Sequence, residues 1–423
     1  MSEARLTSDP IVWWVRKWDC DAMLILSNLA QRFKLPSVQL GKLGGLESFI
    51  VAPGSRDLLY ATYCMRLLLI NAPHGFVREM SRRDHDLLIA DGEVSHIEAE
   101  LKHPRCEFLE FRGRKKIDSA AIRLLRQTVQ RFKPDLIHAF LPASLAQSVI
   151  GCMGLKPRPI ILSFRGITRV PSPFDPADWI TYLSPSIAIH ACESEAVKQA
   201  MTRGRVPNEK CEVIYNCVVP ALSLEKRADL RQRFDIPADA FVVGTAACIR
   251  PVKGIDILMR AAAECAALPK IHFLVFGEQK DPHVAELARD NRLRNRVKLT
   301  GYLNDAQRMM PIFDVFVMPS RREGLCRALL EAMDQSICPV VSDAGGMKEM
   351  VRHGVDGLVF PSEDFSALRD SIIQLHGDRN LIASYGASAQ ARVRQICSPE
   401  NFANRLEAIY ERLQRETIPL FRG

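Results

Sequence analysis

The sequence predicts an α/β protein built from two doubly wound, Rossmann-like parallel sheets. Strand-like apolar runs alternate with helical patterns between residues 241 and 362, and a second series of such runs begins at Met65. Alternation of this kind is typical of parallel sheets that are covered by helices on both faces. A chain of 423 residues is long enough for two such domains. Because ligands bind at the carboxyl ends of the strands in open sheets of this type, the loops there are the first places to search for function.

The loop after the buried strand pattern Val315–Pro319 contains two acids, Glu323 and Glu331, around Gly324. Helical spacing begins after this glycine, so the order is strand, polar turn, helix. We expect free backbone N–H groups at Gly324 and Leu325 to suit a phosphate. Seven residues advance a helix by about 700° and about 10 Å, which leaves Glu331 on the same face as Gly324, where it suits the hydroxyls of a ribose. Glu323 then points at whatever the diphosphate carries, although a helix with acids in its first turn explains the acid pair alone at least as well.

Other loops at the same predicted edge carry cations and glycines. Arg250 and Lys253 follow the strand-like run Phe241–Ile249, and two cations in such a loop are what a diphosphate leaving group needs. Gly277 ends the next strand, at a position where a backbone can approach a ligand closely. Further on, the double glycine Gly345–Gly346 forms another strand-to-helix turn. A pair of solvated loop charges is the alternative for the two cations, but several ligand-facing turns in a row favour a phosphate site.

Five segments in this half resemble one enzyme family. In chain order they read RPVKG, GYL, PSRREGLCRALLEAM, SDAGGMKEMV and GVDGLV. They are similar to the carboxyl-terminal domain of the family-4 retaining glycosyltransferases of GT-B fold, closely over residues 210–362 and more weakly back to about residue 65. In this resemblance Glu323 and Glu331 are the two acids of the family's E-x7-E motif. The resemblance implies two Rossmann-like domains that face a central cleft, the second holding a nucleotide sugar and the first an acceptor.

The resemblance also implies a reaction, the transfer of a sugar from a nucleoside diphosphate with retention at the anomeric carbon and without a metal or another cofactor. The segment contains no D-x-D triplet for a bridging Mg²⁺ or Mn²⁺. Lys253 carries over as the group that neutralises the departing diphosphate. Arg250 carries over as a displaced equivalent, because the family places its arginine further from the lysine.

The first half departs from the family at its histidine. KPDLIHAF (residues 133–140) resembles a segment that often reads P-D-[IV]-[IV]-H-x-H, whose second histidine faces the reacting sugar, but Phe140 stands at that position. His138 is the nearest titratable group and is our candidate for a catalytic contribution, with a structural role at the end of a buried strand as the alternative. Arg165 occupies a place where relatives often have histidine, and we expect it to meet the donor phosphate or a charged acceptor.

The domain boundaries follow from these patterns. We expect an acceptor-side domain at residues 65–218 and a donor-binding domain at residues 219–399, with helix 400–423 returning to the first domain. Apolar residues at helical spacing in that helix must be buried: Phe402, Leu406, Ile409 and Leu413. Residues 1–64 form an extension outside the catalytic fold, which is either a tryptophan-bearing arm that touches a membrane or, as we favour, an over-long start ahead of Met65.

Composition and charge limit the compartment, the metals and the binding partners that we expect. Twelve scattered cysteines without a C-x-x-C motif favour a reducing cytosol and argue against disulfides or zinc, and no apolar run approaches 18 residues. The net charge of +8 is concentrated in residues 112–133, which form either a solvated helix or a face that rests on anionic lipid, where each cation contributes about 1 kcal/mol. Aromatic residues are not interleaved with these charges, which disfavours nucleic acid.

We therefore expect a cytoplasmic enzyme, peripheral at the inner face of the cell membrane, that adds a hexose to a cell-surface glycan or glycolipid of the lipopolysaccharide or capsule type. A small soluble acceptor is the alternative within the same fold. Intact Glu323, Glu331 and Lys253 oppose the third hypothesis, a sugar-nucleotide-binding protein with impaired catalysis, while Phe140 leaves that hypothesis open.

Overall fold

The computed structural model describes residues 64–417 except 114, 222 and 269, together with three strands before residue 64. The chain divides into two compact units, residues 1–63 and 64–423. In the first unit, β1 (Ile11–Val15), β2 (Gln39–Leu43) and β3 (Leu46–Val51) form an antiparallel sheet in the order β1-β3-β2. The sequence analysis placed this region outside the strand–helix alternation and did not predict its strands.

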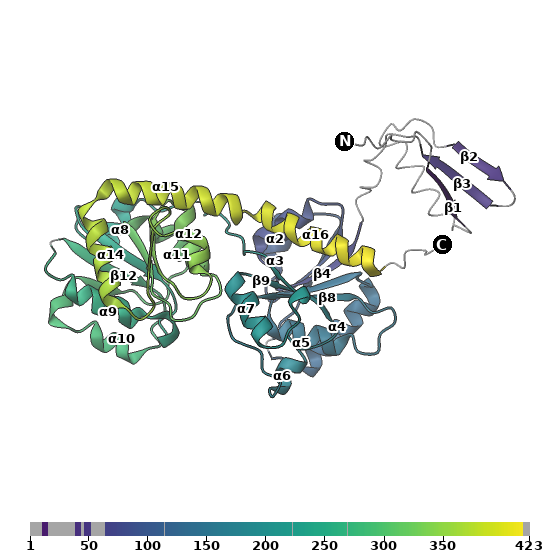
Figure 1. The fold of residues 1–423 in the computed structure, drawn as a ribbon, viewed down its shortest axis with the longest axis horizontal. Helices are drawn as coiled ribbons and strands as arrows, with labels where there is room; N and C mark the ends of the chain where they lie inside the picture. Colours follow the sequence, from purple (N-terminus) through teal and green to yellow (C-terminus); the bar gives the residue numbers. More distant parts are fainter. Residues whose placement is uncertain are drawn as a thin grey trace, which may run out of the picture. The chain divides into compact units, whose positions relative to one another are not determined.

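The first parallel sheet, in the second unit, has seven strands in the order β10-β9-β8-β7-β4-β5-β6. Figure 1 labels β4, β8 and β9 of this sheet. Its strands are β4 (Arg66–Ile70), β5 (Asp86–Asp91), β6 (Cys106–Glu110), β7 (Leu136–Ala139), β8 (Ile160–Arg165), β9 (Ile187–Cys192) and β10 (Cys211–Val213). Its helices are α2 (His74–Ser81), α3 (Ser95–Leu101), α4 (Ser119–Phe132), α5 (Pro142–Gly151), α6 (Pro176–Trp179), α7 (Glu195–Arg203) and the 3₁₀ turn η2 (Asn208–Lys210). Along β4, Leu67 and Leu69 enter one core and Leu68 and Ile70 the other, so the strand is buried on both faces, as parallel strands require.

The second parallel sheet has six strands in the order β13-β12-β11-β14-β15-β16. Its strands are β11 (Phe241–Ala246), β12 (Ile271–Phe276), β13 (Val297–Leu299), β14 (Val315–Met318), β15 (Cys338–Ser342) and β16 (Leu358–Phe360). Its helices are α8 (Arg227–Arg233), α9 (Ile255–Glu264), α10 (Pro282–Leu287), α11 (Ala306–Met309), α12 (Arg327–Asp334), α13 (Met347–Met350), α14 (Phe365–Gly377) and α15 (Arg379–Ile396), with the 3₁₀ turns η3 (Pro251–Lys253), η4 (Asn291–Leu293) and η5 (Met310–Ile312). The predicted α/β class with two doubly wound parallel sheets is confirmed.

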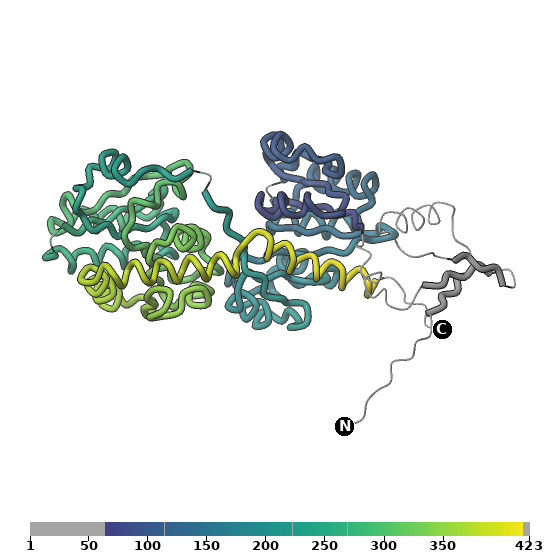
Figure 2. The backbone as a smooth tube through the Cα atoms, turned by 90° about the horizontal axis from the view of Figure 1, so that it is seen from above, coloured from purple at the N-terminus to yellow at the C-terminus, as the bar shows by residue number. Residues whose placement is uncertain are grey.

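The last described helix, α16 (Pro399–Thr417), follows α15 in the chain but packs on the first sheet (Figures 1 and 2). The Phe402 ring lies 5.3 Å from the Phe76 ring and 5.7 Å from the Phe164 ring, centroid to centroid. The packing expected for the apolar stripe of this helix is therefore observed. Where the chain passes between the two sheets, the Val218 N–H donates to the Cys397 carbonyl at 2.9 Å, so the two connecting segments are hydrogen-bonded to each other.

Candidate functional site

The loops after β11 and β14 meet at the switch point of the second sheet. Strand order runs outward from β11 to β13 on one side and from β14 to β16 on the other, and open α/β sheets bind ligands at such a point. Lys253, in η3, and Glu323, after β14, come together there, with Nζ of Lys253 2.5 Å from Oε2 of Glu323. Two of the residues singled out from sequence, 70 positions apart, thus form one ion pair.

The Lys253–Glu323 pair is sheltered from solvent, because the two side chains are 17% and 15% exposed. Ser320 Oγ also donates to Oε2 of Glu323 at 3.3 Å. Burial lowers the pKa of Lys253, but its interactions with Cys326 and Glu323 outweigh burial and leave the pKa raised. The ammonium therefore stays charged near neutral pH, in a site where a charge acts more strongly than in water.

Arg321, which the sequence analysis did not single out, ties the two loops together. Its backbone N–H donates to the Val252 carbonyl at 2.9 Å, and its guanidinium forms a bidentate pair with Asp256 at 2.7 and 2.8 Å. The same guanidinium bonds Glu363 at 2.5 and 2.9 Å. A planar fork with four carboxylate bonds fixes the Glu323 loop against the Lys253 loop. The sequence signal was the first of the two arginines in SRRE, two residues before the acid.

The predicted glycines are close-packing positions. Gly345 has φ +64°, and a Cβ there would lie 1.8 Å from the Glu323 carbonyl oxygen. The double-glycine turn therefore packs directly against the backbone of Glu323. Gly277 has φ +150°, and its Cβ would lie 1.9 Å from the Ala247 carbonyl oxygen. The close approach expected at Gly277 is thus an approach of protein backbone, in the loop that leads to Lys253, and not of a ligand.

Glu331 lies on α12, 14% exposed, and accepts a hydrogen bond from Nε of Arg327 at 3.0 Å. Burial raises the pKa of this carboxyl. The helix starts at Arg327, three residues later than Gly324, with Cys326 as its extended N-cap residue. Arg250 is exposed at the start of η3, near enough that its charge lowers the pKa of Lys253.

Leu325 contradicts one expectation. Its backbone N–H is not free for a phosphate, because it donates to Oε1 of Glu193 at 2.7 Å. Glu193 follows β9 of the first sheet and is buried. Sequence reasoning missed Glu193, and the available signal was an acid between a buried strand and the Ser194 cap of α7.

A second carboxylate makes the reverse contact. Glu349, in α13 of the second sheet, accepts from the backbone N–H groups of Glu195 and Ala196 at 2.9 Å each. These groups begin α7, whose N-terminus attracts negative charge. Tyr215 donates its hydroxyl to the same carboxylate at 3.1 Å. Each sheet edge therefore places one acid on backbone N–H groups of the other.

His138 does not reach the site, and the catalytic role considered for it is withdrawn. The ring is fully buried, with Nδ1 2.6 Å from the Tyr410 hydroxyl. It stacks on Phe140 with ring centroids 4.1 Å apart. Burial lowers the pKa of His138 to about 3, so the imidazole is neutral near neutral pH. The side chain belongs to the packing between β7 and α16.

Arg165 is also a core residue, which contradicts the predicted donor contact. Its guanidinium lies 3.7 Å from the centre of the Tyr182 ring, and Nη2 donates to the Arg169 carbonyl at 2.7 Å. Burial lowers the pKa of Arg165, which the neighbouring Tyr182 opposes. The residue that the loop does bring to the site is Gly166, which packs on Glu193 and Gly324.

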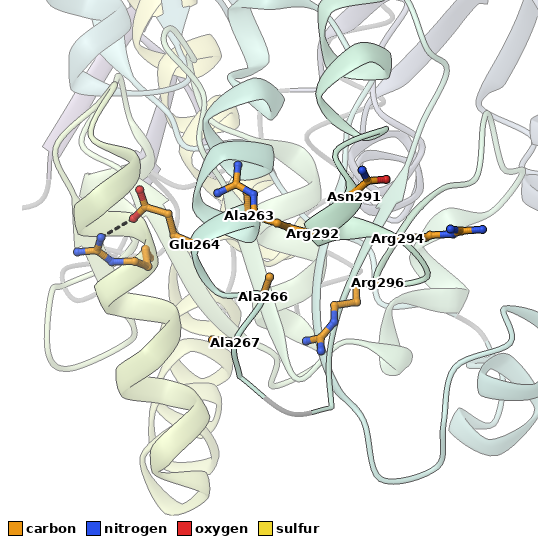
Figure 3. Close-up of a pocket in the computed structure, with 9 residues that line it drawn as sticks. Ala263, Glu264, Ala266, Ala267, Asn291, Arg292, Arg294 and Arg296 are labelled. Atoms are coloured by element: carbon orange, nitrogen blue, oxygen red, sulfur yellow. Dashed lines mark hydrogen bonds and ion pairs between the residues drawn. The ribbon is translucent and has the colours of Figure 1, made fainter.

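A cavity of about 720 Å³ lies elsewhere, between the end of α9 and η4 (Figure 3). Its polar lining comes mainly from arginines, and the Glu264 carboxylate pairs with Arg369 across one side. These segments precede β12 and β13, so the cavity is at the amino edge of the sheet, opposite the Lys253–Glu323 pair. Within the described residues, no group of three or more His, Cys, Asp or Glu side chains is placed to hold a metal ion. None of the helices in this part of the chain has the length and apolarity needed to cross a bilayer.

Comparisons with known proteins agree with this fold. A family model described as Glycosyltransferase Family 4 matches residues 74–222, and one described as Glycosyl transferases group 1 matches residues 226–392. The O-antigen biosynthesis glycosyltransferase WclY of Escherichia coli is 28% identical over 216 residues, 50% of this chain and 59% of that protein. The lipopolysaccharide core biosynthesis mannosyltransferase LpsB of Rhizobium meliloti (strain 1021) is 30% identical over 190 residues, 42% and 53% of the two chains. The matched part of the chain thus spans a little over half the length of these curated relatives.

Solved structures share the fold. Anabaena Alr3699/HepE in complex with UDP-glucose superposes with a TM-score of 0.68 at 20% identity, over 82% of this chain and 100% of the other. Sucrose-phosphate synthase from Thermosynechococcus elongatus superposes with a TM-score of 0.67 at 17% identity, over 84% and 100%. Two family models matched in order along the two sheets, together with this shared fold, show that the chain belongs to the family-4 glycosyltransferases of GT-B fold.

Proposed function

We propose that the protein transfers a hexose from a nucleoside-diphosphate sugar to a cell-surface glycan or glycolipid, with retention at the anomeric carbon. The observation that carries the proposal is the sheltered Lys253–Glu323 pair at the switch point, held in place by Arg321. A fixed cation is needed where the leaving diphosphate gathers charge, and a carboxylate beside it can accept hydrogen bonds from sugar hydroxyls. The proposed donor-binding set is then Gly324, Leu325 and Glu331, where the Leu325 N–H must first be released from Glu193, and Gly277 supports the set only through its packing on the Lys253 loop.

In the proposed reaction, the bond between the anomeric carbon and the diphosphate oxygen breaks, and the acceptor oxygen bonds to that carbon from the same side. Negative charge grows on the departing diphosphate, where Lys253 neutralises it and the exposed Arg250 assists. Because His138 is buried, we assign the proton of the acceptor hydroxyl to the departing phosphate oxygen. These cations take the part that a metal ion plays in other sugar transferases.

The relatives' printed names support the acceptor class, since they describe O-antigen and lipopolysaccharide core biosynthesis. The basic segment 112–133 supports work at an anionic membrane surface, and we propose the inner face of the cell membrane as its place. Leu125 and Val129 of α4 are buried, while Arg123 and Arg131 are exposed. A relative named N-acetyl-alpha-D-glucosaminyl L-malate synthase, 22% identical over 212 residues, favours a small soluble acceptor as the second candidate.

A donor screen tests the proposal. Purified protein is incubated with UDP- and GDP-sugars, with and without a chelator, and the release of UDP or GDP is measured while NMR follows the anomeric configuration. We expect slow hydrolysis of one donor with retention and no effect of the chelator. Tight binding of UDP or GDP without turnover of any donor would instead support a binding protein. Inversion of configuration would contradict the proposed mechanism.

A further inference from the structure

Glu193 is an acid that the first sheet contributes to the proposed donor site of the second. It is 5% exposed, and its Oε1 accepts the Leu325 N–H at 2.7 Å. Leu325 directly follows Gly324 and Glu323, the loop that the proposed function assigns to the donor. The carboxylate thus binds the same kind of group that a phosphate oxygen would bind.

The position of Glu193 is built by two glycines, one from each sheet edge. A Cβ on Gly324 would lie 2.2 Å from Oε1 of Glu193, and a Cβ on Gly166 would lie 3.1 Å from Oε2. Any larger residue at Gly324 would displace the carboxylate. Space for an anionic group therefore exists at this point, and Glu193 fills it.

The backbone that carries Glu193 is held by the second sheet. Glu349 accepts the N–H groups of Glu195 and Ala196, two and three residues after Glu193. This anchor keeps the start of α7 close to the donor loops, so Glu193 cannot leave the site without either a change of its own rotamer or an opening between the two sheets.

Two carboxylates and a single ammonium meet around Glu193. The facing charged groups are Glu323 and Lys253, and Lys253 is engaged by Glu323. Burial raises the pKa of Glu193 well above its usual range, while the Leu325 N–H lowers it, Glu323 raises it and Lys253 lowers it. A diphosphate added to two carboxylates and one ammonium would meet an excess of negative charge.

We propose that Glu193 occupies the phosphate position of the donor-free protein, and that a nucleoside diphosphate binds by displacing it. This inference rests on the proposed function, because it takes the Glu323–Leu325 loop as the place where the diphosphate binds. Glu193 sets the affinity for the donor and links donor binding to the contact between the two sheets. Displacement is easier when the carboxyl carries a proton, so the competition strengthens as pH rises through the raised pKa of Glu193.

The test is the affinity for UDP and for GDP, measured by calorimetry on the full chain between pH 5.5 and 8.5. Glu193→Gln removes the charge and keeps the shape, and Glu193→Ala removes the side chain. We expect both variants to bind the nucleotide about tenfold more tightly than wild type at pH 8.5, equivalent to about 1.4 kcal/mol. The ratio of the wild-type to the Glu193→Gln dissociation constant should approach one as pH falls. Taking this ratio cancels the titration of the nucleotide, which is the same for both proteins. Glu195→Gln, an exposed acid two residues away, serves as the control and should match wild type.

The outcomes separate this inference from the proposed function. If wild type binds a nucleotide and the two Glu193 variants bind it equally or more weakly, the competition does not exist and the proposed function stands. Weaker turnover of the sugar nucleotide in Glu193→Ala with unchanged UDP affinity would make Glu193 a sugar contact, and would also overturn the competition. If neither wild type nor Glu193→Ala binds UDP or GDP at any pH, the proposed function itself fails.

Discussion

The two parallel sheets differ in what surrounds the titratable side chains near the carboxyl ends of their strands. At the switch point of the second sheet, Lys253 pairs with Glu323, while Arg321 of the same loop pairs with Asp256 and Glu363. At the matching edge of the first sheet, His138 and Arg165 point into the core, against Tyr410 and Tyr182. Titratable side chains at strand ends are therefore paired with one another in the loops of one half and packed against aromatic rings in the other. A charged residue at a strand end is the better site candidate where a neighbouring loop supplies an ion-pair partner than where the residue packs on an aromatic ring.

The largest expected effect is a loss of stability in the first sheet when the buried ring of Phe402 is removed. Phe402 is buried between Phe76 and Phe164, so Phe402→Ala should lower the free energy of unfolding by about 3–5 kcal/mol. The measurement is urea unfolding, with Ile373→Ala on the exposed side of α14 as the control, expected within about 0.5 kcal/mol of wild type. Equal stability of the two variants would mean that α16 does not contribute to the first core.

The charged half should lose activity while the fold is kept. Lys253→Ala removes the fixed cation, and kcat/KM for the donor should fall by about 100-fold, or about 2.7 kcal/mol, with little change in unfolding. Lys270→Ala, which removes an exposed lysine paired with Asp239, is the matched control. Near-wild-type turnover of Lys253→Ala would remove this residue from the proposed mechanism.

The burial of His138 should make the stability of the packed half depend on pH. Its folded pKa of about 3 lies below the ordinary 6.5, so the unfolded chain takes up a proton that the folded chain refuses. Stability from this residue is complete above pH 6.5 and declines as pH falls toward 3, by at most about 2 kcal/mol at pH 5. His138→Gln should flatten the fall of the unfolding free energy below pH 6.5, although His190 and His85, whose pKa values are also lowered, retain part of the slope. An unchanged slope would contradict a buried neutral imidazole.

The two acids of the charged half should differ from each other. Glu331→Gln should weaken UDP binding about tenfold, equivalent to about 1.4 kcal/mol, if this carboxylate binds the ribose as proposed. Glu323→Gln should lower turnover without weakening UDP binding, since it frees Lys253 from its ion pair. Calorimetry and initial rates on both variants distinguish the two roles. Identical losses of nucleotide affinity would argue against the division.

The smallest effect is expected from removing the first unit. Residues 65–423 should fold cooperatively and keep donor turnover, because the two parallel sheets and their cores lie within residues 64–417. Loss of solubility or turnover in this shortened chain would show that residues 1–64 complete the enzyme.

Sequence predicted the second sheet better than the first for a physical reason. The loops around Lys253 and Glu323 need particular glycines and charges in a row, and such local requirements are visible in the chain. The burial of His138 depends on Tyr410, 272 positions away, and the contact between Glu193 and Leu325 spans 132 positions. No local pattern encodes such distant contacts. The helix was predicted to begin directly after Gly324 but begins at Arg327, and the Leu325 N–H, ahead of the Cys326 cap, is bonded instead to the distant acid Glu193.

The route of α16 has a consequence for synthesis of the chain. Phe402, Leu406 and Tyr410 complete a core whose other members begin at Met65. Proteins are made from the amino end, and domains generally fold as they emerge from the ribosome. The sheet that is made first must therefore wait, with part of its apolar face uncovered, until the second sheet has been translated and α16 has followed it. A chaperone that shields exposed apolar surface should bind nascent chains that stop before residue 399 more strongly than those that reach residue 417.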